Sequence, residues 1–273
     1  MHDTTIRKVY VDTSAGQLHY RSVDAPDSAS APVLFFHRTP VTSASFTRVL
    51  HQLSGWRRLI AFDTPGFGES FVPPDDAGMA TFVRAFADAI PALGIERFHL
   101  VGHHTGCHFA AELAALPGSG ALSLLMDGAM VPSAEERARV VPPIPAPVID
   151  RSGSYARNAW DFLQPFYTVV DERCIHDEYV GALASTFTRT ACMKVVRGHD
   201  LGALLGAIRC PIIACAAQDD VFAPHLERVS AVNDAAVIRR YGNAGIASPE
   251  LQTAAFCELV RESVALGERG KPG

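Results

Sequence analysis

Long apolar runs are missing from this chain. No stretch of the sequence approaches the roughly 20 consecutive apolar residues that a membrane-spanning helix needs. The first residues, Met1 to Thr5, also lack the basic segment followed by an apolar one that marks a secretory signal. We therefore expect a soluble, cytoplasmic protein that has no membrane partner.

Basic clusters and paired cysteines are absent as well. The 24 Lys and Arg are scattered and are outnumbered by 29 Asp and Glu, which argues against nucleic acid as a partner. The six cysteines form no C-x-x-C pair, and we expect them to be small buried residues in a reducing compartment. No G-x-G-x-x-G follows a strand-like segment, and no cofactor is expected.

What the sequence does contain is an alternation of strand-like and helix-like segments. The clearest predicted helices cover residues 42–53, 80–93, 105–116 and 249–264. Eight apolar, β-branched segments have strand length, namely residues 8–11, 17–22, 33–37, 58–63, 98–103, 122–127, 211–217 and 237–241. This order predicts an α/β fold with a mostly parallel sheet, whose ligands bind at the carboxyl ends of the strands.

The alternation stops for about 80 residues between Asp127 and Pro211, which is longer than a plain crossover needs. We interpret residues 131–199 as a cap inserted into a core of residues 1–130 and 200–273. Helical spacing recurs in the cap at residues 155–166 and 177–194. Its aromatic residues, including Trp160 and Phe166, either line the roof of a pocket or pack as core, and the sequence favours neither.

Three motifs follow strands in a fixed order. They are His37 to Pro40 (H-R-T-P), Asp63 to Ser70 (D-T-P-G-F-G-E-S) and Gly102 to Gly106 (G-H-H-T-G). They resemble the H-G-x-P loop, the D-x-P-G-x-G-x-S turn and the G-x-S-x-G nucleophile elbow of the α/β-hydrolase superfamily. The resemblance covers nearly the whole chain outside the cap. It implies the α/β-hydrolase fold, with an eight-stranded sheet, helices on both faces and a helical cap.

Two departures from this family concern its catalytic triad. His104 occupies the elbow where the family has its serine, so serine-based acyl transfer is not expected. The family's general-base histidine should follow the last strand, yet residues 242–248 (G-N-A-G-I-A-S) contain none, and the last histidine is His225. The resemblance leaves an acid at Asp220, with Asp219 as its neighbour, or at Asp127.

The resemblance also suggests roles for the remaining site residues. A carboxylate beside His104 would fix its tautomer and strengthen it as a general base or nucleophile, and the amides of Thr39 and Thr105 would form an oxyanion hole. The candidate substrate-binding residues are His37, Arg38, Trp160 and Phe166. In this family His37 normally bonds the backbone and orders its loop. Arg38 replaces a glycine, and either adds a cation beside the hole or turns outward to cap the loop.

His104 and His108 are four residues apart, a spacing that places both on one helix face and that metal ligands can have. No H-E-x-x-H pattern accompanies them, and in this family the position of His108 usually packs inward. We therefore expect no metal.

The function predicted from these residues is an enzyme that acts on a small, largely apolar carbonyl, ester or lactone compound by histidine-based catalysis. Hydrolase, lyase, and cyclase or isomerase reactions all remain open. The alternative is a non-catalytic ligand-binding pseudoenzyme of the same fold, which the missing loop histidine favours. A small molecule is the expected partner, and a homodimer is possible.

Overall fold

The computed structural model describes residues 5–25, 30–133, 135–136, 148–169 and 171–269. All eight predicted strands are present in one sheet of order β1-β2-β4-β3-β5-β6-β7-β8. Their bounds are β1 Arg7–Thr13, β2 Gly16–Val23, β3 Val33–Phe36, β4 Leu59–Phe62, β5 Phe98–His103, β6 Ala121–Asp127, β7 Ile212–Ala217 and β8 Val237–Tyr241. β2 pairs antiparallel with β1 and β4, and the pairs from β4 to β8 are parallel. The prediction of a mostly parallel sheet is therefore confirmed.

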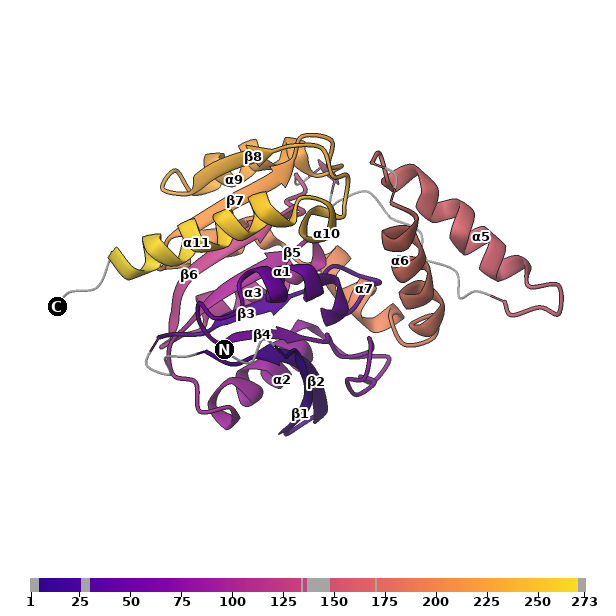
Figure 1. Cartoon of the computed structure of the whole chain (residues 1–273), viewed down its shortest axis with the longest axis horizontal. Coiled ribbons are helices and arrows are strands. Elements are labelled where there is room, and N and C mark those ends of the chain that lie inside the picture. The colour runs from indigo at the N-terminus through magenta and orange to yellow at the C-terminus, as the bar shows by residue number, and fades with distance from the viewer. Residues whose placement is uncertain (1–4, 26–29, 134, 137–147, 170, 270–273) are drawn as a thin grey trace.

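Helices cover both faces of this sheet (Figure 1). Alternate residues of β3 enter opposite apolar clusters, Leu34 and Phe36 on one face and Val33 and Phe35 on the other. The first cluster contains side chains of α2 (Met79–Ala92), α3 (Thr105–Ala115), α8 (Leu201–Leu205) and α9 (Leu226–Val232). The second contains side chains of α1 (Thr47–Gln52) and α11 (Thr253–Arg269). Burial on both faces accounts for the continuously apolar strands.

The long segment between β6 and β7 contains helices that lie beyond the carboxyl ends of the strands (Figure 1). These are α5 (Ser154–Leu163), the 3-10 turn η2 (Gln164–Phe166), α6 (Glu172–Ala184) and α7 (Thr190–Gly198). We call residues 148–198 of this segment, as far as they are described, the insertion. Residues 134, 137–147 and 170 of the predicted cap lie outside the described residues.

The prediction of one helix over residues 177–194 is wrong, because α6 ends at Ala184 and α7 begins at Thr190. The hydroxyls of Ser185 and Thr186 donate to the carbonyls of Gly181 and Ala182 at 2.7 and 3.0 Å. Such bonds compete with the helical amides for the same acceptors and favour a helix end.

The predicted helices 42–53 and 249–264 are each divided in two. The 3-10 turn η1 (Ser43–Phe46) precedes α1, and α10 (Ser248–Leu251) precedes α11. Among the described helices, none is both long and apolar enough to cross a lipid bilayer.

Candidate functional site

The turn between β5 and α3 carries His104. This residue has φ 47° and ψ −110°, and it is the one non-glycine residue with positive φ in the described part of the chain. Gly102, two residues earlier, has no room for a side chain, since a Cβ there would lie 2.5 Å from Cα of Cys107. A histidine held at positive φ is strained, and strain of this kind is characteristic of functional sites. The strand–turn–helix geometry expected from the glycine spacing is therefore present, with His104 in its middle.

Asp220 is the acid that contacts His104. Nε2 of His104 lies 2.8 Å from Oδ2 of Asp220, which follows β7, and the amide of Phe222 donates to Oδ1 of the same carboxylate at 2.7 Å. Both residues are buried. A carboxylate accepts hydrogen bonds, so Nε2 carries the proton and Nδ1 carries the lone pair of the neutral ring. Nδ1 makes no hydrogen bond within the described residues, and the side chain keeps 8% of its surface accessible.

The pKa of His104 is raised above its usual 6.5. Burial lowers the pKa of the ring, but the neighbouring Asp220 carboxylate more than offsets this effect, with a smaller contribution from Asp127. A carboxylate that raises the pKa of an imidazole also makes its neutral form a stronger base. The pair is therefore suited to taking up and returning a proton near neutral pH.

Asp127, the other acid left open by the sequence, ends β6 directly below this pair. The hydroxyl of Tyr241 and the thiol of Cys215 donate to its Oδ1, and Oδ2 lies 3.5 Å from Nε2 of His103. Burial raises the pKa of Asp127 to about 7, although the hydrogen bond from Tyr241 by itself lowers this pKa. The carboxyl group influences His104 electrostatically and makes no hydrogen bond to its ring.

Asp219 holds the loop of residues 242–248, where a histidine was expected from the family resemblance, by hydrogen bonds. Its Oδ1 accepts from the amides of Ala244 and Gly245 at 2.8 and 3.0 Å, and its Oδ2 accepts from the hydroxyl of Thr168 in the insertion. Gly245 has φ 51°, and a Cβ there would lie 2.5 Å from the carbonyl oxygen of Phe166. The loop is closed against the insertion and leaves no room for a larger residue at that position.

The two amides expected to form an oxyanion hole come from the segments that follow the neighbouring strands β3 and β5. Thr39 follows β3, and its amide donates to the side-chain hydroxyl of Thr105 at 2.8 Å. Thr105 is the first residue of α3, and amides at a helix N-terminus have no acceptor within the helix. The structure brings Thr39 and Thr105 together as expected. The motif did not indicate that the Thr105 hydroxyl would accept the hydrogen bond of the Thr39 amide.

His37 is a structural residue of the loop after β3. The ring is fully buried, the amide of Thr64 donates to its Nε2 at 2.9 Å, and its Nδ1 donates to the carbonyl of Arg38 at 2.7 Å. Both nitrogens are thus engaged with backbone. This geometry matches the ordering role and leaves no ring nitrogen for the substrate contact that the sequence also proposed.

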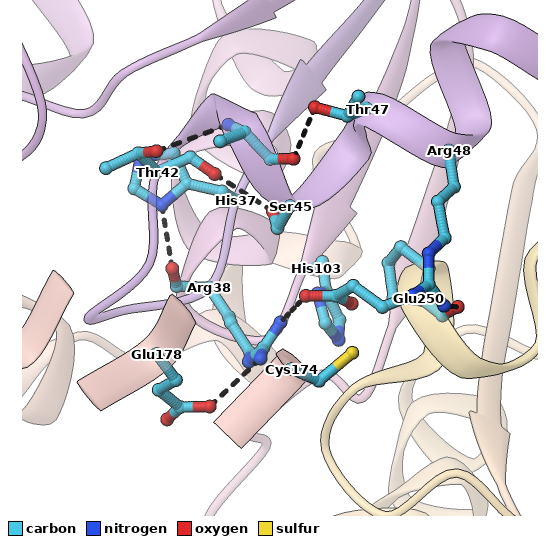
Figure 2. Close-up of polar contacts among 12 residues, drawn as sticks. His37, Arg38, Thr42, Ser45, Thr47, Arg48, His103, Cys174, Glu178 and Glu250 are labelled. Atoms are coloured by element: carbon cyan, nitrogen blue, oxygen red, sulfur yellow. Dashed lines mark hydrogen bonds and ion pairs between the residues drawn. The ribbon is translucent and has the colours of Figure 1, made fainter. Parts of the chain in front are cut away.

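Arg38 points inward, so the alternative in which it turns outward to cap the loop is wrong. Its guanidinium donates to Glu250 at 2.7 Å and to Glu178 at 2.9 Å, and Figure 2 shows the two carboxylates approaching it from two sides. The hydroxyl of Tyr167 is a third partner at 3.0 Å. Only 1% of the arginine is exposed, so the cation joins the core to the insertion and is not free to bind an anionic substrate.

Trp160 and Phe166 pack in a small apolar cluster between the insertion and the loop after β8. The buried members of this cluster are Tyr167, Cys174, Ile175, Ile246 and Ala247. The ring of Trp160 also meets Tyr179 edge-on at 5.2 Å. These contacts correspond to the packing alternative left open by the sequence, and contact of either aromatic with a substrate stays a prediction.

His108 is paired with another imidazole and takes no part in the His104 contacts. Nδ1 of His108 lies 2.8 Å from Nδ1 of His199, and Nε2 of His199 lies 2.7 Å from Oε1 of Glu112. Burial lowers the pKa of His108 to about 3, which keeps this ring neutral. Within the described residues, no three histidine, cysteine, aspartate or glutamate side chains are grouped so that they could hold a metal ion.

Several residues that shape the site escaped the sequence analysis. Gly128 was not singled out, although a Cβ there would overlap the ring of His104 and lie 2.8 Å from Oδ2 of Asp220. Glu178 and Glu250, the partners of Arg38, lie 140 and 212 residues away in the chain, and no local pattern marks them. The one sequence feature that could have drawn attention to Gly128 is its position directly after Asp127, at the end of a predicted strand.

Comparisons with known proteins bear on the fold of the chain. Residues 31–146 match the family model described as alpha/beta hydrolase fold. The chain is similar to the "Putative carbamate hydrolase RutD" of Klebsiella pneumoniae (strain 342), with 28% identity over 178 residues that cover 61% of this chain and 65% of the relative's length. The match to the family model covers less than half of the chain, and the order of the strands agrees with the fold that it describes.

Solved structures support the fold alone. A hydrolase from Pseudomonas aeruginosa PA01 superposes with a TM-score of 0.79 and 20% identity, covering 94% of this chain and 98% of that one. The enol-lactonase from Burkholderia xenovorans LB400 superposes with a TM-score of 0.75 and 17% identity, covering 94% and 100%.

Proposed function

We propose that this chain is a small-molecule hydrolase in which His104 and Asp220 act as a catalytic dyad on a small, largely apolar ester or lactone. The observation that carries the proposal is the 2.8 Å contact between His104 and Asp220 at a strained turn, with Nδ1 left without a partner in the described part of the chain. The RutD relative, named as a carbamate hydrolase, supports hydrolysis of a carbonyl compound, and the enol-lactonase shares the fold.

In the proposed reaction, Nδ1 of His104 accepts a proton from a water molecule while the oxygen of that water attacks the carbonyl carbon. Asp220 stabilises the imidazolium that forms, because its carboxylate bonds Nε2–H. The amide of Thr105, at the start of α3, stabilises the negative oxygen of the tetrahedral intermediate. The intermediate then expels the alcohol oxygen, which takes the proton back from Nδ1, so that ester and water give acid and alcohol.

Water as the attacking group distinguishes this proposal from a serine hydrolase. His104 occupies the position of the family's serine, and its imidazole is long enough to reach the acid directly. A single residue thereby takes the contact with Asp220 that a separate loop histidine would otherwise make, consistent with the closed loop around Gly245. We propose further that the insertion, joined to the core through Arg38, acts as a cap over this site.

The test is a panel of 4-nitrophenyl acetate, dihydrocoumarin and further small esters and lactones, assayed with wild type and His104→Ala. We expect His104→Ala to reduce kcat/KM by about a hundredfold or more, the effect of losing positioned proton transfer. His176→Ala is the control, because His176 is an exposed imidazole on α6 that can also attack activated esters. Equal rates for His104→Ala and His176→Ala would contradict the proposal.

A further inference from the structure

The hydroxyl of Thr105 accepts a hydrogen bond from one of the two amides expected to form the oxyanion hole. The Thr39 amide donates to Oγ1 of Thr105 at 2.8 Å, which is a well-formed hydrogen bond. The same hydroxyl lies 3.5 Å from the carbonyl oxygen of His37, at the outer limit for a bond. Its principal interaction is thus as the acceptor for the Thr39 amide, which lies in the loop after β3.

The neighbourhood keeps Thr39 and Thr105 in this arrangement. The side chain of Thr39 is turned toward Met193 of α7, with its Oγ1 3.2 Å from the sulfur, and the loop before Thr39 is ordered by the buried ring of His37. Thr105 is fixed at the first position of α3 by the turn at His104. Both threonines are only partly buried, so part of each residue stays exposed to solvent.

We infer that Thr105 is a specificity-determining residue whose side chain competes with the substrate for the Thr39 amide. A neutral carbonyl must displace the Thr105 hydroxyl before it can accept hydrogen bonds from both amides. Until then it accepts a hydrogen bond from the Thr105 amide alone. An oxygen that gains negative charge is a stronger acceptor than a hydroxyl, because charge-assisted hydrogen bonds are roughly twice as strong as neutral ones. The arrangement therefore favours substrates whose carbonyl oxygen is a strong hydrogen-bond acceptor over simple neutral esters.

This inference rests on the proposed function, and it predicts a gain of activity. Thr105→Ala removes the competing hydroxyl and keeps the backbone amide. We expect its kcat/KM for 4-nitrophenyl acetate to rise by about tenfold or more, since one oxyanion-hole donor is commonly worth a hundredfold. Thr105→Ser retains a hydroxyl and should show little of this gain. Thr186→Ala is the control for loss of a threonine hydroxyl elsewhere, because Thr186 bonds the Ala182 carbonyl in the insertion and should leave the rate unchanged.

A second measurement keeps the inference testable apart from catalysis. The Thr39 amide proton should move upfield in the NMR spectrum and exchange faster with solvent in Thr105→Ala, but not in Thr105→Ser. A folded Thr105→Ala with an unchanged Thr39 resonance, or with no rise in ester hydrolysis, would overturn the inference. Failure of the proposed function is a different result, because it would appear as His104→Ala retaining full activity in the same assay.

Discussion

Gly128 lies directly against the imidazole of His104: a Cβ on this glycine would overlap Cδ2 and Nε2, the edge that faces Asp220. The residue also has φ 62°, a conformation that other L-residues adopt only with strain. The position directly after β6 can thus be filled only by glycine if the contact between His104 and Asp220 is kept.

Gly128→Ala should therefore separate His104 from Asp220. We expect a loss of about 2 to 4 kcal/mol in the free energy of unfolding, from backbone strain and overpacking together, and loss of esterase activity. Gly118→Ala is the matched control, since Gly118 has φ 71° with open space around its Cα, and strain alone should cost about 1 kcal/mol. Urea unfolding compares the two variants, and equal losses would show that the ring of His104 is not confined by Gly128.

Arg38 should be the most important single side chain for joining the insertion to the core. Arg38→Met leaves the buried carboxylates of Glu178 and Glu250 without their cation, and removing one partner of a buried ion pair typically costs about 3 to 5 kcal/mol. Adding Glu178→Gln and Glu250→Gln to Arg38→Met should restore much of this loss in urea unfolding.

The exposed pair of Arg173 and Asp177 on α6 provides the comparison, because exposed ion pairs contribute little. Arg173→Met should leave the unfolding curve unchanged. A similarly small effect of Arg38→Met would contradict the role assigned to Arg38.

Asp127 should make the protein less stable as the pH rises. Its pKa is about 7 in the folded state against an ordinary 3.8, so the folded chain holds this proton more tightly and loses stability between pH 4 and pH 7. Asp127→Asn mimics the protonated acid and keeps an oxygen for Tyr241. We expect the variant to gain about 1 to 4 kcal/mol relative to wild type between pH 5 and pH 8.

Urea unfolding at these two pH values measures the effect, with Asp177→Asn as a control at an exposed carboxylate. Parallel stability curves for wild type and Asp127→Asn would show that Asp127 is ionised in the folded protein throughout this range.

Serine-directed fluorophosphonate probes should not label the protein. His104 holds the turn where the family has serine, and Ser70 in the neighbouring motif is engaged in structure: its hydroxyl donates to the Asp63 carbonyl at 2.7 Å and accepts from the His19 amide at 3.0 Å. Mass spectrometry after incubation, beside a serine esterase as positive control, provides the measurement. Stoichiometric labelling of a serine would point to a different nucleophile.

The fold could be predicted from the sequence because it depends on local patterns. Apolar strands and helical periods repeat at the right spacing, and Gly102 and Gly106 mark the turn around His104. The contact between His104 and Asp220 spans 116 residues, so the sequence could name both ends without choosing Asp220 over Asp127. No local sequence pattern marks distant partners such as Glu178. Because the direction of the Arg38 side chain depends on these partners, it could not be predicted from the sequence.

The pH dependence of kcat/KM in wild type and Asp220→Asn tests the central claim, that Asp220 makes His104 a base. Activity requires neutral His104, so the wild-type rate should rise with pH through an inflection above 6.5, as the raised pKa of His104 requires. Asp220→Asn removes the larger of the two carboxylate effects on His104, and burial should then move the inflection below 6.5. Its plateau should fall less than that of His104→Ala, because the carboxylate only polarises the ring. Identical profiles for wild type and Asp220→Asn would contradict the account.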